Sequence, residues 1–213
     1  MEIFKKKLYN SNFFRKFRRK SLGRRAIKEL QPWAINGFPL PPHHIVKQFY
    51  LLSLAKKHKL STLIETGTYL GEMVFALEPY FTNIFSIEID EALYSKAKHR
   101  FKNSKNITLH HGDSGRVLKK VIVDIQKPSL IWLDGHYSGP GTGMADMSTP
   151  IIDELNAISE IGHTDSVIFI DDIHCFNGFD GYPALDELIH KVRDLNFTIL
   201  ENKLNILSLQ KTM

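Results

Sequence analysis

Short apolar and β-branched runs alternate with longer amphipathic stretches along most of the chain. Five of the runs predict strands, at 63–66, 83–89, 107–111, 129–134 and 166–171. The stretches that follow them predict helices, at 71–79, 91–101, 115–125, 149–161 and 183–195. Because parallel strands need long crossover connections, this alternation is typical of a parallel sheet that is covered on both faces.

The C-terminal end departs from this alternation. Two runs, 197–201 and 204–210, are separated only by Asn202-Lys203, which suits a tight hairpin. The sequence therefore predicts an α/β, doubly wound, Rossmann-like fold with seven strands, mostly parallel and with an antiparallel C-terminal strand. A further helix at 43–58 is largely apolar on one side and is expected to cover an edge of the sheet or a ligand pocket.

The first 42 residues differ in character from the rest and are predicted to form an extension to one domain at 43–213. Residues 1–30 contain 11 Lys or Arg, and their local net charge is +9. The whole chain carries +5, so the remaining residues carry −4. Aromatic side chains lie among the basic ones, and prolines at 32, 39, 41 and 42 predict a linker.

Several partners suit this basic extension. Its composition favours an anionic membrane surface. Lys and Arg beside aromatic residues also suit nucleic acid. An Arg-rich organelle presequence, and a solvated extension that packs on its own domain, remain open alternatives. The sequence leaves a homo-oligomer open as well.

Composition limits the class of protein. With 213 residues, 43% of them hydrophobic and 24% charged, the chain can bury a core without disulfides. The single Cys175 excludes an internal disulfide and favours a reducing compartment, so we expect a cytoplasmic protein, peripheral to a membrane if the extension binds lipid. There is no apolar run of about 18 residues that could span a bilayer.

The turn after the first strand carries the strongest functional signal. Glu65 ends the apolar run, and Gly67 and Gly71 follow in a G-x-x-x-G pattern before a helix. Glycines at such a turn let the backbone approach a ligand, and the helix start offers N–H groups to an anionic group. Glu88 ends the next strand, 21 positions beyond Gly67, where a carboxylate can reach the hydroxyls of a ribose. The pair predicts a nucleoside site.

Other nucleotide motifs do not fit this turn. A dinucleotide fingerprint has G-x-G-x-x-G, and a Walker loop has Gly-Lys-Ser/Thr, and neither occurs here. Glu65 would repel a phosphate but suits a cationic ligand. After the third strand, Asp113 could accept from an adenine amino group and Ser114 could donate to a ring nitrogen, although either residue suits a helix cap equally well.

Three carboxylates and two imidazoles follow the fourth and fifth strands: Asp134, His136, Asp171, Asp172 and His174. Ligands of open α/β sheets bind outside the carboxyl ends of the strands, so these side chains are expected to meet there. Oxygen donors favour a hard divalent cation such as Mg²⁺, which would offset the repulsion between Asp171 and Asp172. In the alternative without metal, Asp134 bonds a cofactor ammonium group and Asp172 caps a turn.

With these motifs, residues 61–210 resemble the class I S-adenosylmethionine-dependent methyltransferases. The resemblance is greatest to the macrocin O-methyltransferase type and to its relatives in polysaccharide gene clusters. It implies that the turn holds the methionine part of the cofactor, that Glu88 holds the ribose, and that a sugar hydroxyl is the acceptor. It also implies that Mg²⁺ is bound by Asp134, Asp171 and Asp172. The implied cofactor residues are Glu65, Gly67, Thr68, Tyr69, Gly71, Glu88, Asp113, Ser114 and Asp134.

Methyl transfer from a sulfonium requires alignment of the acceptor oxygen and removal of its proton. His136 is the first candidate for the base because imidazole titrates near neutrality, and Asp134 and His174 are the reserves. The loop at 135–143 is richer in glycine than the pattern of the resembled family. It suits either a lid that closes on the acceptor or an ordinary surface loop.

Two other hypotheses remain. A metal-independent or nucleic-acid methyltransferase is less favoured, because the fourth strand is followed by Asp134-Gly135-His136-Tyr137 and not by a Pro-Pro-Tyr or Pro-Pro-Phe motif. Cys175 also follows the wrong strand for pyrimidine C5 methylation. The other hypothesis is a non-catalytic module that keeps the cofactor fold and docks through its basic extension.

Overall fold

The structure is a computed structural model that describes residues 12–125, 127–135, 149–161 and 165–211. The chain divides into two compact units, residues 1–47 and 48–213. None of the helices in the described part of the chain is long and apolar enough to cross a bilayer.

The first unit is dominated by one helix, α2 (Asn12–Ile35). This helix continues through Pro32 to Ile35. Pro32, the first of the four prolines that predicted a linker, is therefore part of the helix. A proline removes only its own N–H, and the Pro32 carbonyl still accepts from Asn36 N at 3.0 Å. In the last turn of the helix, Trp33 Nε1 donates to the carbonyl of Pro39 at 2.8 Å and so stabilises the turn that follows the helix.

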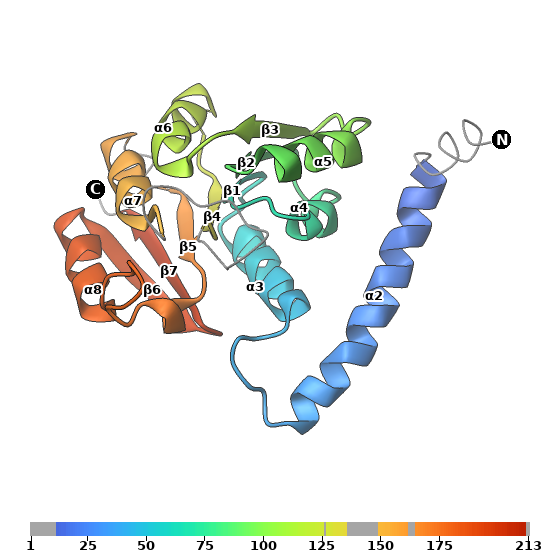
Figure 1. Ribbon diagram of the computed structural model, residues 1–213, viewed down its shortest axis with the longest axis horizontal. Coiled ribbons are helices and arrows are strands. Elements are labelled where there is room, and N and C mark those ends of the chain that lie inside the picture. The colour runs from blue at the N-terminus through green and yellow to red at the C-terminus, as the bar shows by residue number, and fades with distance from the viewer. Residues whose placement is uncertain (1–11, 126, 136–148, 162–164, 212–213) are drawn as a thin grey trace. The chain divides into compact units, whose positions relative to one another are not determined.

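The second unit is built on a seven-stranded sheet with the order β3-β2-β1-β4-β5-β7-β6 (Figure 1). The strands are β1 (Thr62–Thr66), β2 (Asn83–Glu88), β3 (Ile107–His111), β4 (Leu130–Leu133), β5 (Val167–Ile170), β6 (Phe197–Lys203) and β7 (Ile206–Lys211). The first five are parallel to one another, and β7 lies antiparallel between β5 and β6. The predicted α/β fold is therefore confirmed. Because the chain moves outward from β1 in both directions, the carboxyl ends of β1 and β4 form the switch point at which such sheets bind ligands.

Six helices cover the two faces of this sheet. One face packs against α3 (His44–Lys57), α4 (Glu72–Leu77) and α5 (Glu91–Phe101), and the other against α6 (Ser114–Ile125), α7 (Ile151–Ile161) and α8 (Leu185–Asp194). Neighbouring strand residues point to opposite faces, so Leu63 lies in the first core and Ile64 in the second. Burial on both faces explains why the central strands β4 and β5 are continuously apolar.

The C-terminal hairpin turns two residues later than predicted. Asn202 and Lys203 pair with β7, and the turn is made by Leu204 and Asn205, with φ angles of 57° and 60°. Two consecutive positive φ angles are typical of the type I′ turn, which matches the twist of the flanking strands and favours Asn. The predicted turn at Asn202-Lys203 was therefore wrong, because both residues continue the ladder with β7.

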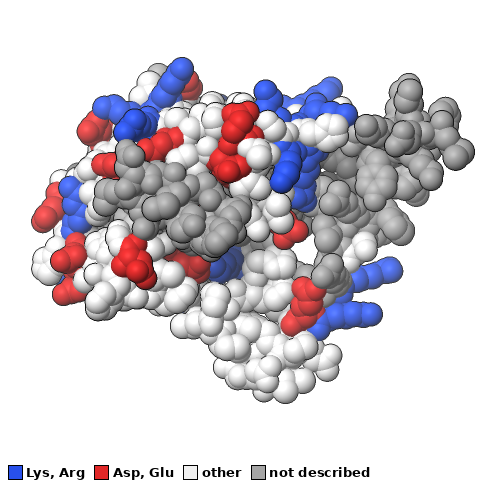
Figure 2. All heavy atoms as spheres, viewed as in Figure 1, with Lys and Arg blue, Asp and Glu red and all other residues white. Residues whose placement is uncertain are grey.

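Charge on the second unit is mixed. Figure 2 shows acidic and basic side chains interspersed on the visible face, without a large area of one sign. By sequence, residues 1–30 carry a net charge of +9 and the other residues carry −4.

Candidate functional site

The turn after β1 is shaped by contact with the end of β4. Gly67 has a φ of 82°, and a Cβ built on it would lie 2.3 Å from the carbonyl oxygen of Asp134. The Asp134 N–H lies 3.2 Å from the hydroxyl oxygen of Thr66 and 3.3 Å from its carbonyl oxygen. Glycine is thus required at position 67 by the protein's own main chain, whereas the sequence pattern pointed to the approach of a ligand.

The second glycine of the pattern has a similar role. Gly71 precedes α4 with a φ of 68°, and a Cβ there would lie 2.7 Å from the ring of Phe101 on α5. Both glycines therefore allow close packing around the turn, and they leave Tyr69 between them half exposed.

Glu88 ties the end of β2 to this turn. Its two carboxylate oxygens accept from the main-chain N–H groups of Tyr69, at 2.7 Å, and Asp90, at 2.9 Å. Each carboxylate oxygen has a second lone pair, so these bonds leave acceptor capacity for ligand hydroxyls. Glu88 therefore orders the turn from the end of β2.

Glu65 lies inside the protein beneath the turn. It is 2% exposed, and Ser86 Oγ donates to its Oε2 at 2.5 Å while also lying 2.6 Å from Thr68 Oγ1. Burial raises the pKa of Glu65 to about 8, with a smaller upward contribution from the charge of Glu88 and an opposing one from Ser86. Its carboxyl is therefore neutral at pH 7. This position differs from the expectation of a charged side chain that faces a cationic ligand.

Asp113 and Ser114 lie where β3 meets α6. Asp113 Oδ1 accepts from Gly115 N at 3.0 Å, which is the capping role that the sequence left open. Ser114 is buried, and its hydroxyl contributes to lowering the pKa of a buried carboxyl, Glu154. In this structure Ser114 therefore interacts with the protein interior.

Glu154 on α7 was missed by the sequence analysis. It is 1% exposed, and burial raises its pKa to about 7, although the hydroxyls of Ser114 and Thr66 lower it. Its Oε1 has no hydrogen-bond partner among the described residues and lies 3.3 Å from the position that a Cβ on Gly135 would occupy. The signal was present, because Glu154 falls three positions after Ile151 on the apolar stripe of its helix.

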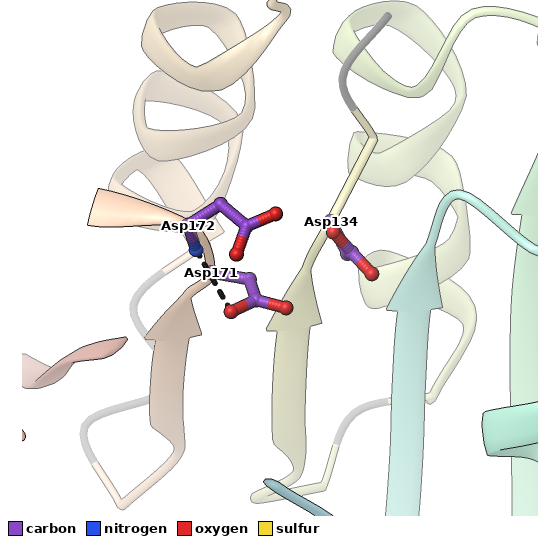
Figure 3. Close-up of side chains that lie close together, drawn as sticks. All are labelled: Asp134, Asp171 and Asp172. Atoms are coloured by element: carbon purple, nitrogen blue, oxygen red, sulfur yellow. Dashed lines mark hydrogen bonds between the residues drawn. The ribbon is translucent and has the colours of Figure 1, made fainter. Parts of the chain in front are cut away.

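The three predicted metal ligands do come together. Asp134 follows β4, and Asp171 and Asp172 follow β5, with one ligand oxygen of each within 4.8 Å of the others (Figure 3). Oxygens that bind one Mg²⁺ at about 2.1 Å are about 3 to 4 Å apart, so a small adjustment would close the site on an ion. Asp171 is 4% exposed, and its Oδ1 accepts from Asp172 N at 2.8 Å. Three carboxylates at this spacing form a donor set that fits a hard divalent cation.

The phenol of Tyr182 interacts electrostatically with this cluster, and the sequence analysis did not identify it. Burial, followed by the charges of Cys175, Asp172 and Asp134, raises the pKa of its phenol. The ring packs edge-on against Phe176 at 5.4 Å between centroids. Tyr182 therefore belongs to the surroundings of the carboxylates, on the segment that follows β5.

Of the two histidines that were predicted as candidate bases, only His174 lies among the described residues. His136 and most of the glycine-rich loop lie outside the described residues, and so does the predicted lid. His174 is described, and its ring lies between Asn205, with Nδ1 2.7 Å from Nδ2, and Cys175, with Nε2 3.6 Å from Sγ.

Comparison with known proteins shows similarity in fold but not in sequence. No family model matches the chain, and no curated protein matches its sequence. Among solved structures, the S-adenosylhomocysteine-bound methyltransferase PaMTH1 from Podospora anserina is 16% identical, with 88% of each chain covered and a TM-score of 0.60. The N-methyltransferase NodS from Bradyrhizobium japonicum is 13% identical over 80% of this chain and 97% of its own, with a TM-score of 0.58. The O-methyltransferase TomG from Streptomyces achromogenes, involved in tomaymycin synthesis, is 14% identical over 88% and 89%, with a TM-score of 0.56. The chain therefore has the fold of the S-adenosylmethionine-dependent methyltransferases.

The contact at Gly67 predicts a large effect of one methyl group. Gly67→Ala combines a positive φ with a Cβ only 2.3 Å from a carbonyl oxygen, whereas Gly178→Ala has a φ of 81° and nothing nearer than 3.7 Å. Left-handed backbone costs an alanine about 1–2 kcal/mol, and overpacking adds about 1–3 kcal/mol. We expect urea unfolding to show a clearly larger loss of stability for Gly67→Ala than for Gly178→Ala. Equal losses would contradict the close approach of β1 and β4.

The buried carboxyls predict how stability depends on pH. Glu65 and Glu154 have folded pKa values of about 8 and about 7, above their ordinary value of 4.5. Between pH 4.5 and the raised pKa of each group, the folded state binds more protons than the unfolded state. The free energy of unfolding therefore falls as the pH rises from about 4.5 to 8. The slope is about 1 kcal/mol per pH unit for each group inside its window. Glu154→Gln and Glu65→Gln should each flatten the curve between pH 5 and 7, and the exposed Glu72→Gln should not. Parallel curves for all four proteins would be incompatible with the raised pKa values.

Proposed function

We propose that the protein is an S-adenosylmethionine-dependent O-methyltransferase that acts on a hydroxyl of a sugar or glycosylated small molecule, with assistance from Mg²⁺. The observation that carries this proposal is the group formed by Asp134, Asp171 and Asp172, within 4.8 Å of one another at the ends of two adjacent strands. In the sheet, β4 is the neighbour of β1, which leads into the glycine turn, and β1 is the neighbour of β2, which ends in Glu88. This sheet has the methyltransferase fold.

The methyl donor supplies a sulfonium-activated methyl group, so the protein has to bind and orient. In our proposal, Glu88 accepts hydrogen bonds from the ribose hydroxyls, using lone pairs that Tyr69 and Asp90 leave available. The turn at 67–71 lies against the methionine part, and the end of β4 limits its position because Asp134 contacts this turn.

Asp134, Asp171 and Asp172 would hold the metal. Mg²⁺, when bound there, lowers the pKa of coordinated hydroxyls and fixes their direction. The chain must then accept the proton of the acceptor hydroxyl. His136 remains our first candidate for this base, with Asp134 as a reserve. His174 is less suited, because both ring nitrogens already face protein groups.

The basic N-terminal segment suggests where the enzyme works. We propose that residues 1–30, with their net charge of +9, bind an anionic membrane surface and keep the domain near membrane-associated acceptors in the cytoplasm. Removal of these residues is then expected to abolish sedimentation with anionic vesicles and to leave binding of the methyl donor unchanged. Unaltered sedimentation would refute the membrane role without touching the catalytic proposal.

Calorimetric titration of S-adenosylmethionine and Mg²⁺ tests the catalytic proposal. Glu88→Gln should weaken donor binding at least tenfold, because it loses a charged acceptor for the ribose hydroxyls. Asp171→Asn should weaken Mg²⁺ binding at least tenfold and leave donor binding nearly unchanged. The exposed Asp165→Asn serves as the matched control for both and should behave as wild type.

The outcomes separate the candidate functions. Donor binding together with Mg²⁺-dependent transfer of labelled methyl to sugar hydroxyls would support the full proposal. Donor binding and transfer that persist in EDTA would point to a metal-independent methyltransferase. Absence of donor binding to folded protein would refute the methyltransferase proposal altogether.

A further inference from the structure

Asn205 lies in the turn between β6 and β7 and contacts the segment that carries two of the proposed metal ligands. It is nearly buried, at 9% exposed, and it is separated from Asp172 by 33 positions in the sequence. Its main-chain carbonyl accepts from Ile173 N at 3.1 Å. The hairpin turn is therefore bonded directly to the chain that leaves β5.

The side chain of Asn205 makes the more informative contacts. Its Oδ1 accepts from the main-chain N–H of His174 at 2.9 Å, and its Nδ2 donates to Asp172 Oδ1 at 3.0 Å. A main-chain N–H can only donate, and an ionised carboxylate can only accept. The two partners therefore fix the orientation of the amide from both ends.

This orientation also determines the role of His174 Nδ1 in its contact with Asn205. Nδ2 of Asn205 is also 2.7 Å from His174 Nδ1, so its second hydrogen is donated to that nitrogen. An amide nitrogen only donates, so Nδ1 is the acceptor of this contact, and Nε2 of the same ring lies 3.6 Å from Cys175 Sγ. His174 thus completes the hydrogen bonding of Asn205.

Asp172 is a residue that needs such support. Its φ and ψ of 50° and 47° lie in the left-handed region, where a residue with a side chain is held only by its surroundings. Asn205 fixes one of its oxygens and the two residues that follow it. Rotation of the Asp172 carboxylate is restricted as a result.

We propose that Asn205 is a positioning residue that orients Asp172 toward Asp134 and Asp171 and thereby sets the affinity of the site for a divalent cation. It acts through Asp172, because its own amide oxygen is engaged by His174 N. This inference rests on the proposed metal site. Residues that orient metal-binding carboxylates typically change metal affinity by about 10- to 100-fold when they are removed.

The test measures Mn²⁺ binding by the full chain, using the signal of free Mn²⁺ in electron paramagnetic resonance. Asn205→Gly keeps the positive φ of the turn and removes only the amide, and Asn202→Gly is the matched control because Asn202 is exposed in the same hairpin. We expect Asn205→Gly to bind Mn²⁺ at least tenfold more weakly and Asn202→Gly to match wild type. Donor affinity, measured in EDTA, should change less than twofold in both variants.

A double variant distinguishes positioning from general destabilisation. In an Asp172→Ala background the carboxylate that Asn205 orients is gone, so Asn205→Gly should weaken Mn²⁺ binding no further. If Asn205→Gly does not fold, His174→Ala replaces it, because it removes a partner of the amide and leaves the turn intact. The same direction of change is then expected.

The outcomes separate this inference from the proposed function. If wild type binds Mn²⁺ and Asn205→Gly binds it equally well, the positioning role is overturned and the metal site stands. The role is also overturned if the losses in the double variant are additive. If wild type itself does not bind Mn²⁺, the metal-assisted function fails, and the role of Asn205 fails with it.

Discussion

The close approach of the main chains at the ends of β1 and β4 is the constraint on which the rest of the site depends. Gly67 leaves no room for a side chain beside the Asp134 carbonyl, and Thr66 lies within hydrogen-bonding distance of the Asp134 N–H. With these ends in contact, the chains that leave them open onto the same space above the sheet. Glu88 is added from the adjacent β2 and Asp171 from the adjacent β5, because parallel pairing aligns all the carboxyl ends.

Polarity around this space is divided between neutral and charged carboxyls. Glu65 and Glu154 lie on opposite faces of the sheet beneath the strand ends. Glu65 belongs to β1, Glu154 bonds to the next residue of that strand, Thr66, and successive strand residues point to opposite faces. Burial raises the pKa of Glu65 to about 8 and that of Glu154 to about 7, because an isolated charge is costly in an apolar interior. The aspartates that follow β4 and β5 form the acidic cluster.

The antiparallel end of the sheet also contributes to this chemistry. Strand β7 pairs with β5, which brings the hairpin turn beside the residues that follow β5. Asn205 then reaches Asp172 and His174 from a part of the chain that would otherwise only complete the sheet. The antiparallel closure of this fold thus has a local consequence for the orientation of one acidic side chain.

The sequence by itself determined the order of strands and helices, most boundaries to within two residues, and the positions of the glycines and acids at the strand ends. It could do so because burial imposes a period on apolar residues and because strand-to-helix turns need particular residues nearby. It did not determine that α2 continues through Pro32, which turn closes the hairpin, or that Glu154, Tyr182 and Asn205 surround the site. Nor did it distinguish Glu65, buried and neutral, from the aspartates of the cluster. Only the tertiary structure decided these features, because pKa values and hydrogen-bond partners depend on burial and on residues that are remote in the sequence.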